Sequence, residues 1–238
     1  LFRSMSEVAG RMAAQVGAHF LERAHGGRGI LLGGVPGVAP AEVVVLGAGA
    51  VGSNAAMIAT GMGANVTVSA RSPDSLRGIA TQLCSRVRTI VSTREAVEGL
   101  CKQADLVITA ALVPGAAAPK LISKAMVKSM KPGSVIVDVS IDQGGNAETS
   151  RATTHSQPTY TVDGVLHYCV ANMPGAVPRT STLALNNATR LFILALADKG
   201  FRRAIEDDPH LRNGVNVSEG RITCRAVAEA LRLPYAAM

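Results

Sequence analysis

A glycine-rich turn after a short apolar run constrains this chain more than any other feature. The β-branched run at residues 43–46 fits a buried parallel strand, and Gly47, Gly49 and Gly52 follow it in the spacing G-x-G-x-x-G. In such a turn the first glycine makes the bend, the second admits a pyrophosphate, and the third lets a helix pack closely on the sheet. The motif predicts a dinucleotide-binding site, with a purely structural glycine-rich turn as the alternative.

Apolar runs and helical patterns alternate through the first 178 residues. Such alternation is typical of a doubly wound parallel sheet, so we predict an α/β fold of the Rossmann type. Ligands of such folds bind in the loops that follow the strands, which are here residues 47–52, 111–120 and 140–151. The expected strands are 43–46, 65–69, 89–92, 106–111, 134–139, 159–162 and 167–170, and the expected helices are 4–24, 53–60, 74–85, 93–102 and 120–130.

The sequence predicts two parts. Residues 1–178 would form the dinucleotide-binding domain, led by a connecting helix at 4–24, on which His19 is expected to be a packed or surface residue rather than a ligand. Residues 179–238 would form a C-terminal helical segment without a sheet of its own. Its expected helices are 180–198, 201–207 and 223–231.

Composition excludes several classes of function. The net charge is +7, but aromatic residues make up only 3% and the basic residues are scattered, which favours a solvated surface over a nucleic-acid site. The four cysteines form no C-x-x-C pair, so neither a zinc site nor a disulfide framework is indicated. No apolar run has the length of a membrane span, and nothing resembles a signal peptide, so a cytoplasmic protein without a membrane partner is expected.

Five blocks in order closely resemble alanine dehydrogenases, whose neighbouring family is the nucleotide-binding component of proton-translocating transhydrogenases. The blocks are MSEVAG at 5–10, GGVPGV at 33–38, LVPG at 112–115, VDVSIDQGG at 137–145 and ANMPGAVP at 171–178. The resemblance implies a hexameric cytoplasmic enzyme that oxidatively deaminates L-alanine to pyruvate and ammonia and passes hydride to a nicotinamide dinucleotide.

The chain departs from that family at its start. It begins at Leu1 rather than at a methionine. The resemblance implies a preceding substrate domain, which is missing here and against which the C-terminal segment would pack. The chain alone is therefore expected to be inactive, and to need that domain or a partner chain to meet L-alanine or pyruvate. A catalytically silent nucleotide-binding or regulatory module and the soluble component of a transhydrogenase remain alternatives.

The resemblance also implies site residues. Asp142 matches the active-site aspartate, and its place after an apolar strand suits a base or a ribose-binding acceptor, although a turn cap is the alternative. Asp138, inside the strand, is expected to satisfy neighbouring polar groups. The implied cofactor contacts are Ser6 on the first helix, Ala50 at the pyrophosphate turn, Ser92 near the adenine, Ala111, Leu112 and Leu121 in the cleft, and Val139, Ser140, Ile141, Asp142, Arg151, Val170, Ala171, Asn172 and Met173 around the nicotinamide and its ribose.

Two further positions depart from the family pattern. The acidic residue of NAD-dependent members at the end of the second strand is replaced by Ala70, followed by Arg71 and Ser72. A guanidinium beside a hydroxyl suits a 2′-phosphate, so NADP is favoured over NAD, and Asp74 is expected to cap the next helix. The family's metal-binding positions correspond to Ala195 and Lys199. No metal is therefore expected there.

Overall fold

The computed structural model describes residues 3–112 and 117–238. Part of the block at 112–115 and of the loop at 111–120 therefore lies outside the described residues. The chain divides into two compact units after Ser181. We call residues 3–112 with 117–181 the sheet unit, and residues 182–238 the C-terminal unit.

The sheet unit contains a seven-stranded sheet in the order β3-β2-β1-β4-β5-β7-β6. Neighbouring strands are parallel except β6 and β7, and Val45 of β1 pairs with Val68 of β2 and Ile108 of β4. This arrangement confirms the predicted α/β, doubly wound fold, with an antiparallel edge. The strands are β1 (Glu42–Leu46), β2 (Asn65–Ala70), β3 (Arg88–Val91), β4 (Leu106–Thr109), β5 (Val135–Asp138), β6 (Thr159–Val162) and β7 (Val165–Tyr168).

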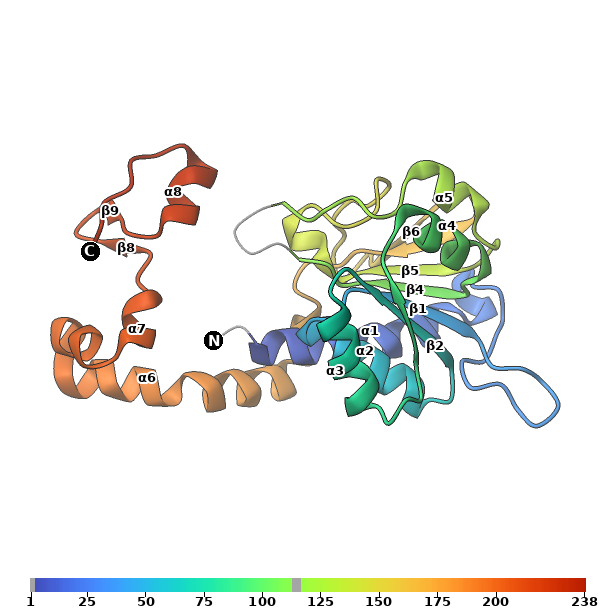
Figure 1. Ribbon diagram of the computed structural model, residues 1–238, viewed down its shortest axis with the longest axis horizontal. Helices are drawn as coiled ribbons and strands as arrows, with labels where there is room; N and C mark the ends of the chain where they lie inside the picture. Colours follow the sequence, from blue (N-terminus) through green and yellow to red (C-terminus); the bar gives the residue numbers. More distant parts are fainter. Residues whose placement is uncertain (1–2, 113–116) are drawn as a thin grey trace. The chain divides into compact units, whose positions relative to one another are not determined.

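Helices cover both faces of this sheet. Figure 1 shows α1, α2 and α3 on one face and α4 and α5 on the other. The central strands are apolar at nearly every position because both of their faces are buried. The helices of the unit are α1 (Arg3–Phe20), α2 (Ala50–Gly61), α3 (Pro73–Gln82), α4 (Arg94–Gln103) and α5 (Lys124–Ser129), and its 3-10 helices are η1 (Arg23–His25), η2 (Val139–Gln143) and η3 (Met173–Ala176).

Alternate residues of one strand serve the two cores. Val44 and Leu46 of β1 belong to a buried cluster with Val97 of α4 and Val127 of α5. On the other face, a Cβ on Gly52 of α2 would lie 3.4 Å from a methyl group of Val45 in the same strand. The β-strand period of two thus fixes which helix each residue meets.

The helix expected at 120–130 is shorter than the sequence suggested. The N–H groups of Leu121 and Ile122 donate to the carbonyl of Asn146 at 2.7 and 3.1 Å, which holds these residues in an extended conformation. Ser123 then caps α5 by accepting from the N–H of Met126 at 3.2 Å. A pairing partner more than 20 residues away therefore overrides the local helical pattern.

The C-terminal unit is not purely helical, so that expectation was wrong. β8 (Val217–Ser218) and β9 (Arg221–Ile222) form a two-stranded antiparallel sheet. Glu219 and Gly220 join them with φ of 50° and 76°, the positive values that a tight hairpin turn of the I′ kind requires. The helices of this region are α6 (Pro178–Asp207), which is kinked at Gly200 with φ of 74°, α7 (Pro209–Asn213) and α8 (Arg225–Leu231).

None of the helices within the described ranges combines the length and the hydropathy that crossing a membrane demands.

Candidate cofactor site

The three glycines of the turn after β1 differ in whether the surrounding backbone leaves room for a side chain. Gly47 has φ of 121°, and a Cβ on it would lie 2.6 Å from the carbonyl oxygen of Ala110. A Cβ on Gly52 would lie 1.9 Å from the carbonyl oxygen of Gly47. Gly49 has φ of −83°, and a Cβ there would meet no atom within 4 Å. The fold itself therefore requires glycine at Gly47 and Gly52 but leaves open space beside Gly49.

The N-terminus of α2 opens onto that space. Gly49 is the N-cap residue and has no side chain with which to occupy the first N–H groups of the 12-residue helix. Such groups and the helix dipole attract phosphate. Helix α1 packs directly on α2 at Gly10, where there is no room for a side chain: a Cβ on Gly10 would lie 2.3 Å from the carbonyl oxygen of Val51. Ser6, half-buried, lies one turn before Gly10 on α1.

A cavity of about 320 Å³ lies beyond the ends of β2 and β3. The backbone joins these ends, since the N–H of Ser92 donates to the carbonyl of Ala70 at 3.0 Å. Three of the residues expected at the site, Arg71, Ser92 and Leu121, line the cavity together. Its charged lining residues are Arg71, Arg94, Lys120 and Glu148. The excess of cationic groups suits an anionic ligand.

The two aspartates after β5 have different environments. Asp138 is fully buried and accepts hydrogen bonds from five donors, namely the hydroxyls of Thr109 and Ser150 and the N–H groups of Ser140, Asn146 and Ala147. It therefore satisfies neighbouring polar groups, as predicted. Asp142 lies in η2 and is exposed. Of the two carboxylates, only that of Asp142 is accessible to a ligand.

Asn146 is a positioning residue that the sequence analysis missed. Its amide group donates to the carbonyls of Ala111 and Pro119 at 3.0 and 2.9 Å and accepts from the N–H of Ala111 at 3.1 Å. The Ser140 hydroxyl also donates to the Ala111 carbonyl, at 3.0 Å. Together these bonds join the segments after β4 and β5. The available signal was a lone asparagine directly after Gly144 and Gly145 in one of the resemblance blocks.

Lys120 was missed as well, and it fastens the same two segments. Its ammonium donates to the carbonyls of Gly144, Gly145 and Ala147 at 2.5, 2.9 and 3.1 Å. A lysine in an expected helix carried no signal for this role. Leu112, which was expected in the cleft, follows Ala111 and is 56% exposed.

The expected nicotinamide-side residues divide into buried and exposed groups. Val170 and Met173 are buried, so their side chains belong to the core and only their backbone could meet a ligand. Ala171 and Asn172 between them are exposed, and Asn172 has φ of 57°. The imidazole Nε2 of His155 lies 3.1 Å from the Asn172 carbonyl oxygen, which supports this turn.

Arg151 and the η2 residues complete the set. The Arg151 guanidinium lies over the ring of Tyr160, 3.9 Å from its centroid, and the backbone N–H of Arg151 donates to the Tyr160 hydroxyl at 2.8 Å. In η2, Ser140 and Ile141 are buried, whereas Val139 is half-buried. Ser6, Gly49, Asp142 and Arg151 are not among the lining residues of the cavity in the described parts of the chain.

The cap of α3 differs from the expectation. Ser72, not Asp74, is the N-cap residue and accepts from the N–H of Ser75 at 3.3 Å. Asp74 instead pairs with Arg77. The Ser72 oxygen is thus engaged, although its hydroxyl hydrogen remains available as a donor. Of the two replaced metal positions, Lys199 pairs with Asp207 at 2.7 Å.

A family model and several curated proteins match this chain over most of its length. The model of "Alanine dehydrogenase/PNT, C-terminal domain" matches residues 13–225. An alanine dehydrogenase of Halomonas elongata is 60% identical over 99% of this chain and 63% of its own length. An alanine dehydrogenase of Mycobacterium tuberculosis is 55% identical over the same shares.

Solved structures match the same family. An L-alanine dehydrogenase superposes with a TM-score of 0.92 and 48% identity, covering 97% of this chain and 64% of the other. A transhydrogenase from Sinorhizobium meliloti reaches a TM-score of 0.66 and 31% identity, covering 80% of this chain and 54% of the other. The chain spans less than two thirds of the length of these relatives. By its sequence and its fold, it belongs to the alanine dehydrogenase/PNT family.

Proposed function

We propose that this chain is the nicotinamide-dinucleotide-binding part of an alanine dehydrogenase, which oxidatively deaminates L-alanine to pyruvate and ammonia. Gly49 carries the proposal. Neither its backbone angles nor its neighbours require a glycine, and the open space beside it lies at an uncapped helix N-terminus. A pyrophosphate that approaches this backbone explains the missing side chain.

Two buried polar atoms, one in β2 and one in η2, also fit a ligand. Ser69 at the end of β2 and Gln143 at the end of η2 each keep a buried side-chain oxygen without a hydrogen-bond partner among the described residues. A dinucleotide offers ribose hydroxyls as donors for such oxygens. When bound, the nicotinamide supplies the acceptor for the hydride. The exposed Asp142 carboxylate would accept a ribose hydrogen bond or take a proton.

Substitution of Gly49 tests the dinucleotide site. The Gly49→Val variant should lose binding of NADH and NADPH in calorimetry and keep its unfolding midpoint, because the added methyl groups fill ligand space rather than core. Gly61→Val at the other end of α2 is the matched control, since a Cβ there also meets nothing within 4 Å. Unchanged dinucleotide affinity in Gly49→Val would show that the turn is only structural.

We further propose that the site prefers NADP over NAD. Arg71 lines the cavity beside Ser92, and Ala70 leaves no carboxylate to repel a 2′-phosphate. Arg71→Ala should weaken NADPH binding by about 1.5 to 3 kcal/mol and leave NADH nearly unchanged, as expected for hydrogen bonds to a charged group. Ala70→Asp should shift the preference towards NADH. Equal weakening of both dinucleotides by Arg71→Ala, or a parent protein that favours NADH, would contradict this preference.

The remaining parts of the proposal concern the assembly. Hydride transfer needs the substrate Cα held at the nicotinamide, and the family resemblance assigns the carboxylate-binding groups to a substrate domain. The 238 residues alone should therefore bind dinucleotide without alanine-dependent reduction. We place residues 179–238 against that domain, in a cytoplasmic homo-oligomer, and the four free cysteines are consistent with a reducing compartment.

One alternative has an observation in its favour. The 31% identical transhydrogenase shares the fold over 80% of this chain, so a soluble transhydrogenase component would keep the same dinucleotide site. Alanine-dependent reduction by the chain together with its substrate domain separates the two activities. A dinucleotide-binding module without catalysis would show binding and neither reaction.

A further inference from the structure

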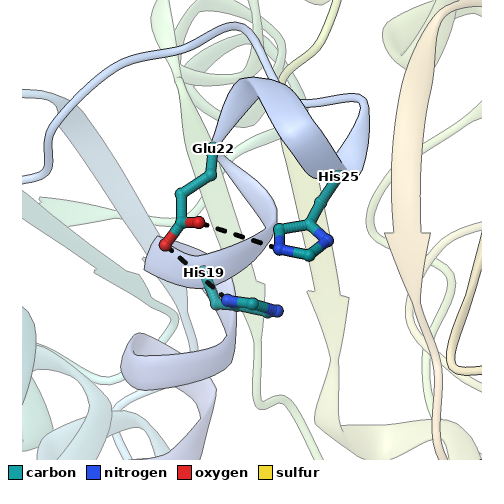
Figure 2. Close-up of side chains that lie close together, drawn as sticks. All are labelled: His19, Glu22 and His25. Carbon is teal, nitrogen blue, oxygen red and sulfur yellow. Dashed lines mark ion pairs between the residues drawn. The ribbon is translucent and has the colours of Figure 1, made fainter.

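Three side chains with metal-ligating atoms gather where α1 ends and η1 follows. One ligand atom each of His19, Glu22 and His25 lies within 4.8 Å of the other two. Figure 2 shows the Glu22 carboxylate directed at both imidazoles. One of its oxygens lies 3.6 Å from His19 Nδ1 and the other 3.7 Å from His25 Nε2. We propose that these three residues bind a divalent transition-metal ion, with Zn²⁺ the best match.

The ligand chemistry favours this class of ion. Imidazole nitrogen suits zinc, copper and nickel, whereas calcium and magnesium prefer oxygen ligands. Two histidines and one carboxylate leave a fourth tetrahedral position for water. In such a site the ligand atoms lie about 3.3 Å apart, a spacing set by metal–ligand bonds of about 2.0 to 2.2 Å. The three ligand atoms therefore need to close by about 1.5 Å at most, which rotation of exposed side chains can supply.

The backbone around the cluster is held in place before any ion binds. The N–H of Gly27 donates to the Glu22 carbonyl at 3.1 Å, and the N–H of Gly29 donates to the carbonyl of the fully buried Leu21 at 2.8 Å. A Cβ on Gly27 would lie 2.3 Å from the Phe20 carbonyl oxygen. Only glycine lets the chain return this closely over the end of α1. That return sets His25 opposite His19.

Neighbouring rings shape the site further. The imidazoles of His19 and His25 have their centroids 3.9 Å apart, and the Phe20 ring lies 5.0 and 5.7 Å from them. Phe20 is itself anchored against Tyr168 of β7 at 5.5 Å. The apolar ring thus covers one side of the cluster. The ligand side chains remain between 35% and 60% exposed, so an ion can enter from solvent.

The cluster lies away from the glycine turn. The last turn of α1 follows Gly17, which packs on Leu106 at the start of β4, and Gly26 lies near Leu166 early in β7. Phe20 also reaches Tyr168 at the carboxyl end of the short strand β7, but the N–H of Arg28, just after the cluster, donates to the carbonyl of Gly133 just before β5. The backbone of the cluster therefore lies towards the amino ends of β4, β5 and β7, whereas Gly49 follows the carboxyl end of β1. A bound ion would therefore fasten η1 to α1 and take no part in hydride transfer.

Calorimetric titration of the full 238-residue chain with ZnCl₂ tests the site. One equivalent of zinc should bind. His19→Gln and His25→Gln should each weaken that binding by more than about 10-fold, because even the loss of a residue that only hydrogen-bonds a metal ligand weakens metal binding by about 10-fold to 100-fold. Glu22→Gln should weaken it less, because an amide oxygen still coordinates. Zinc should also raise the thermal midpoint of the parent chain but not of the double His19→Gln/His25→Gln variant.

Two controls keep the result specific. His210→Gln removes an exposed histidine of α7, and Cys84→Ser removes the exposed thiol, and neither should change zinc affinity. Circular dichroism of each variant establishes that it is folded. Absence of stoichiometric binding by the parent chain would overturn the proposal. Binding that persists unchanged in the double histidine variant would also overturn it.

Discussion

The sheet unit and the C-terminal unit bury their apolar side chains to very different extents. In the sheet unit, Val43, Val45 and Ile108 are fully buried. Among residues 182–238, all of which the structure describes, Ala204 and Ala228 are the only buried apolar residues. Along the first part of α6, Leu183, Leu191, Ile193 and Leu194 are each more than half exposed.

This difference separates two sources of stability. The sheet unit removes its own apolar surface from water, so its fold follows from its own contacts. Large exposed apolar patches are uncommon on monomers and mark surfaces that another protein surface covers. We therefore expect the free energy of unfolding of the sheet unit to depend on its core residues. The C-terminal unit should depend on what covers α6.

The largest expected effect comes from removing the buried Asp138 carboxylate of the sheet unit. Asp138→Ala would leave five donors, four of them buried, without their shared acceptor, and each unsatisfied buried group costs about 1–3 kcal/mol. Even after relaxation, the loss in the free energy of unfolding should be about 4 kcal/mol or more, measured by urea denaturation. Asp142→Ala, at an exposed position, is the matched control and should change stability by less than about 0.5 kcal/mol. Equal effects of the two would show that the buried network does not hold the unit together.

A pair of aliphatic truncations compares the two units directly. Ile108→Ala in β4 should lower the free energy of unfolding by about 2–5 kcal/mol, because it leaves a cavity in a closed core. Leu191→Ala in α6 removes a side chain that is 70% exposed and should change it by less than about 0.5 kcal/mol. Urea denaturation at fixed protein concentration measures both. A large loss from Leu191→Ala would mean that α6 is already covered in the chain alone.

The smallest effect is a pH dependence confined to the sheet unit. Burial lowers the pKa of His167 below its ordinary value of 6.5. The neutral ring fits its partners, since Nδ1 donates to the Val165 carbonyl at 3.0 Å and Nε2 accepts from the Thr149 hydroxyl at 2.8 Å. Below about pH 6.5 the unfolded chain takes up a proton that the folded chain resists. Stability should thus be full above that pH and fall on acidification, by at most about 1.4 kcal/mol per pH unit.

Urea denaturation between pH 7.5 and 5.5 measures this slope. The His167→Gln variant is the control, because it cannot take up the proton in either state. If the parent and the variant lose stability in parallel, the slope comes from other groups. The pH comparison then no longer distinguishes the buried unit from the exposed one.

The central strands and the glycine turn could be predicted because local pattern and tertiary structure agree there. Residues 43–46 are apolar in sequence and buried on both faces in the fold. Features set by distant partners could not be read in the same way. Leu121 and Ile122 leave their helical pattern because Asn146 binds their backbone, and Asn146 acts on Ala111, 35 positions earlier.

The candidate site likewise combines features set by local sequence with features set by distant residues. The glycine turn after β1 could be predicted from sequence, because its three glycines follow an apolar strand at a fixed spacing. That a pyrophosphate binds there stays a prediction. The fastening of the cavity by Lys120 depends on three carbonyls more than 20 positions away. The cap by Ser72 was local, but an acidic residue two positions later was an equally good candidate by sequence alone. The short hairpin of β8 and β9 was hidden in a polar stretch.

The Asp138 network also bears on the entropy of ligand binding. Four of its five donors lie in the segment after β5 and hold that segment to Asp138, and Asn146 and Lys120 tie it to the segment after β4. A loop that is ordered before the ligand arrives does not lose conformational freedom when the ligand binds. Most of the contact energy of a dinucleotide would then appear as affinity. A substitution such as Asn146→Ala would weaken dinucleotide binding without removing any ligand contact. The loops would then lose their conformational freedom only when the ligand binds, and that entropy cost would reduce the affinity.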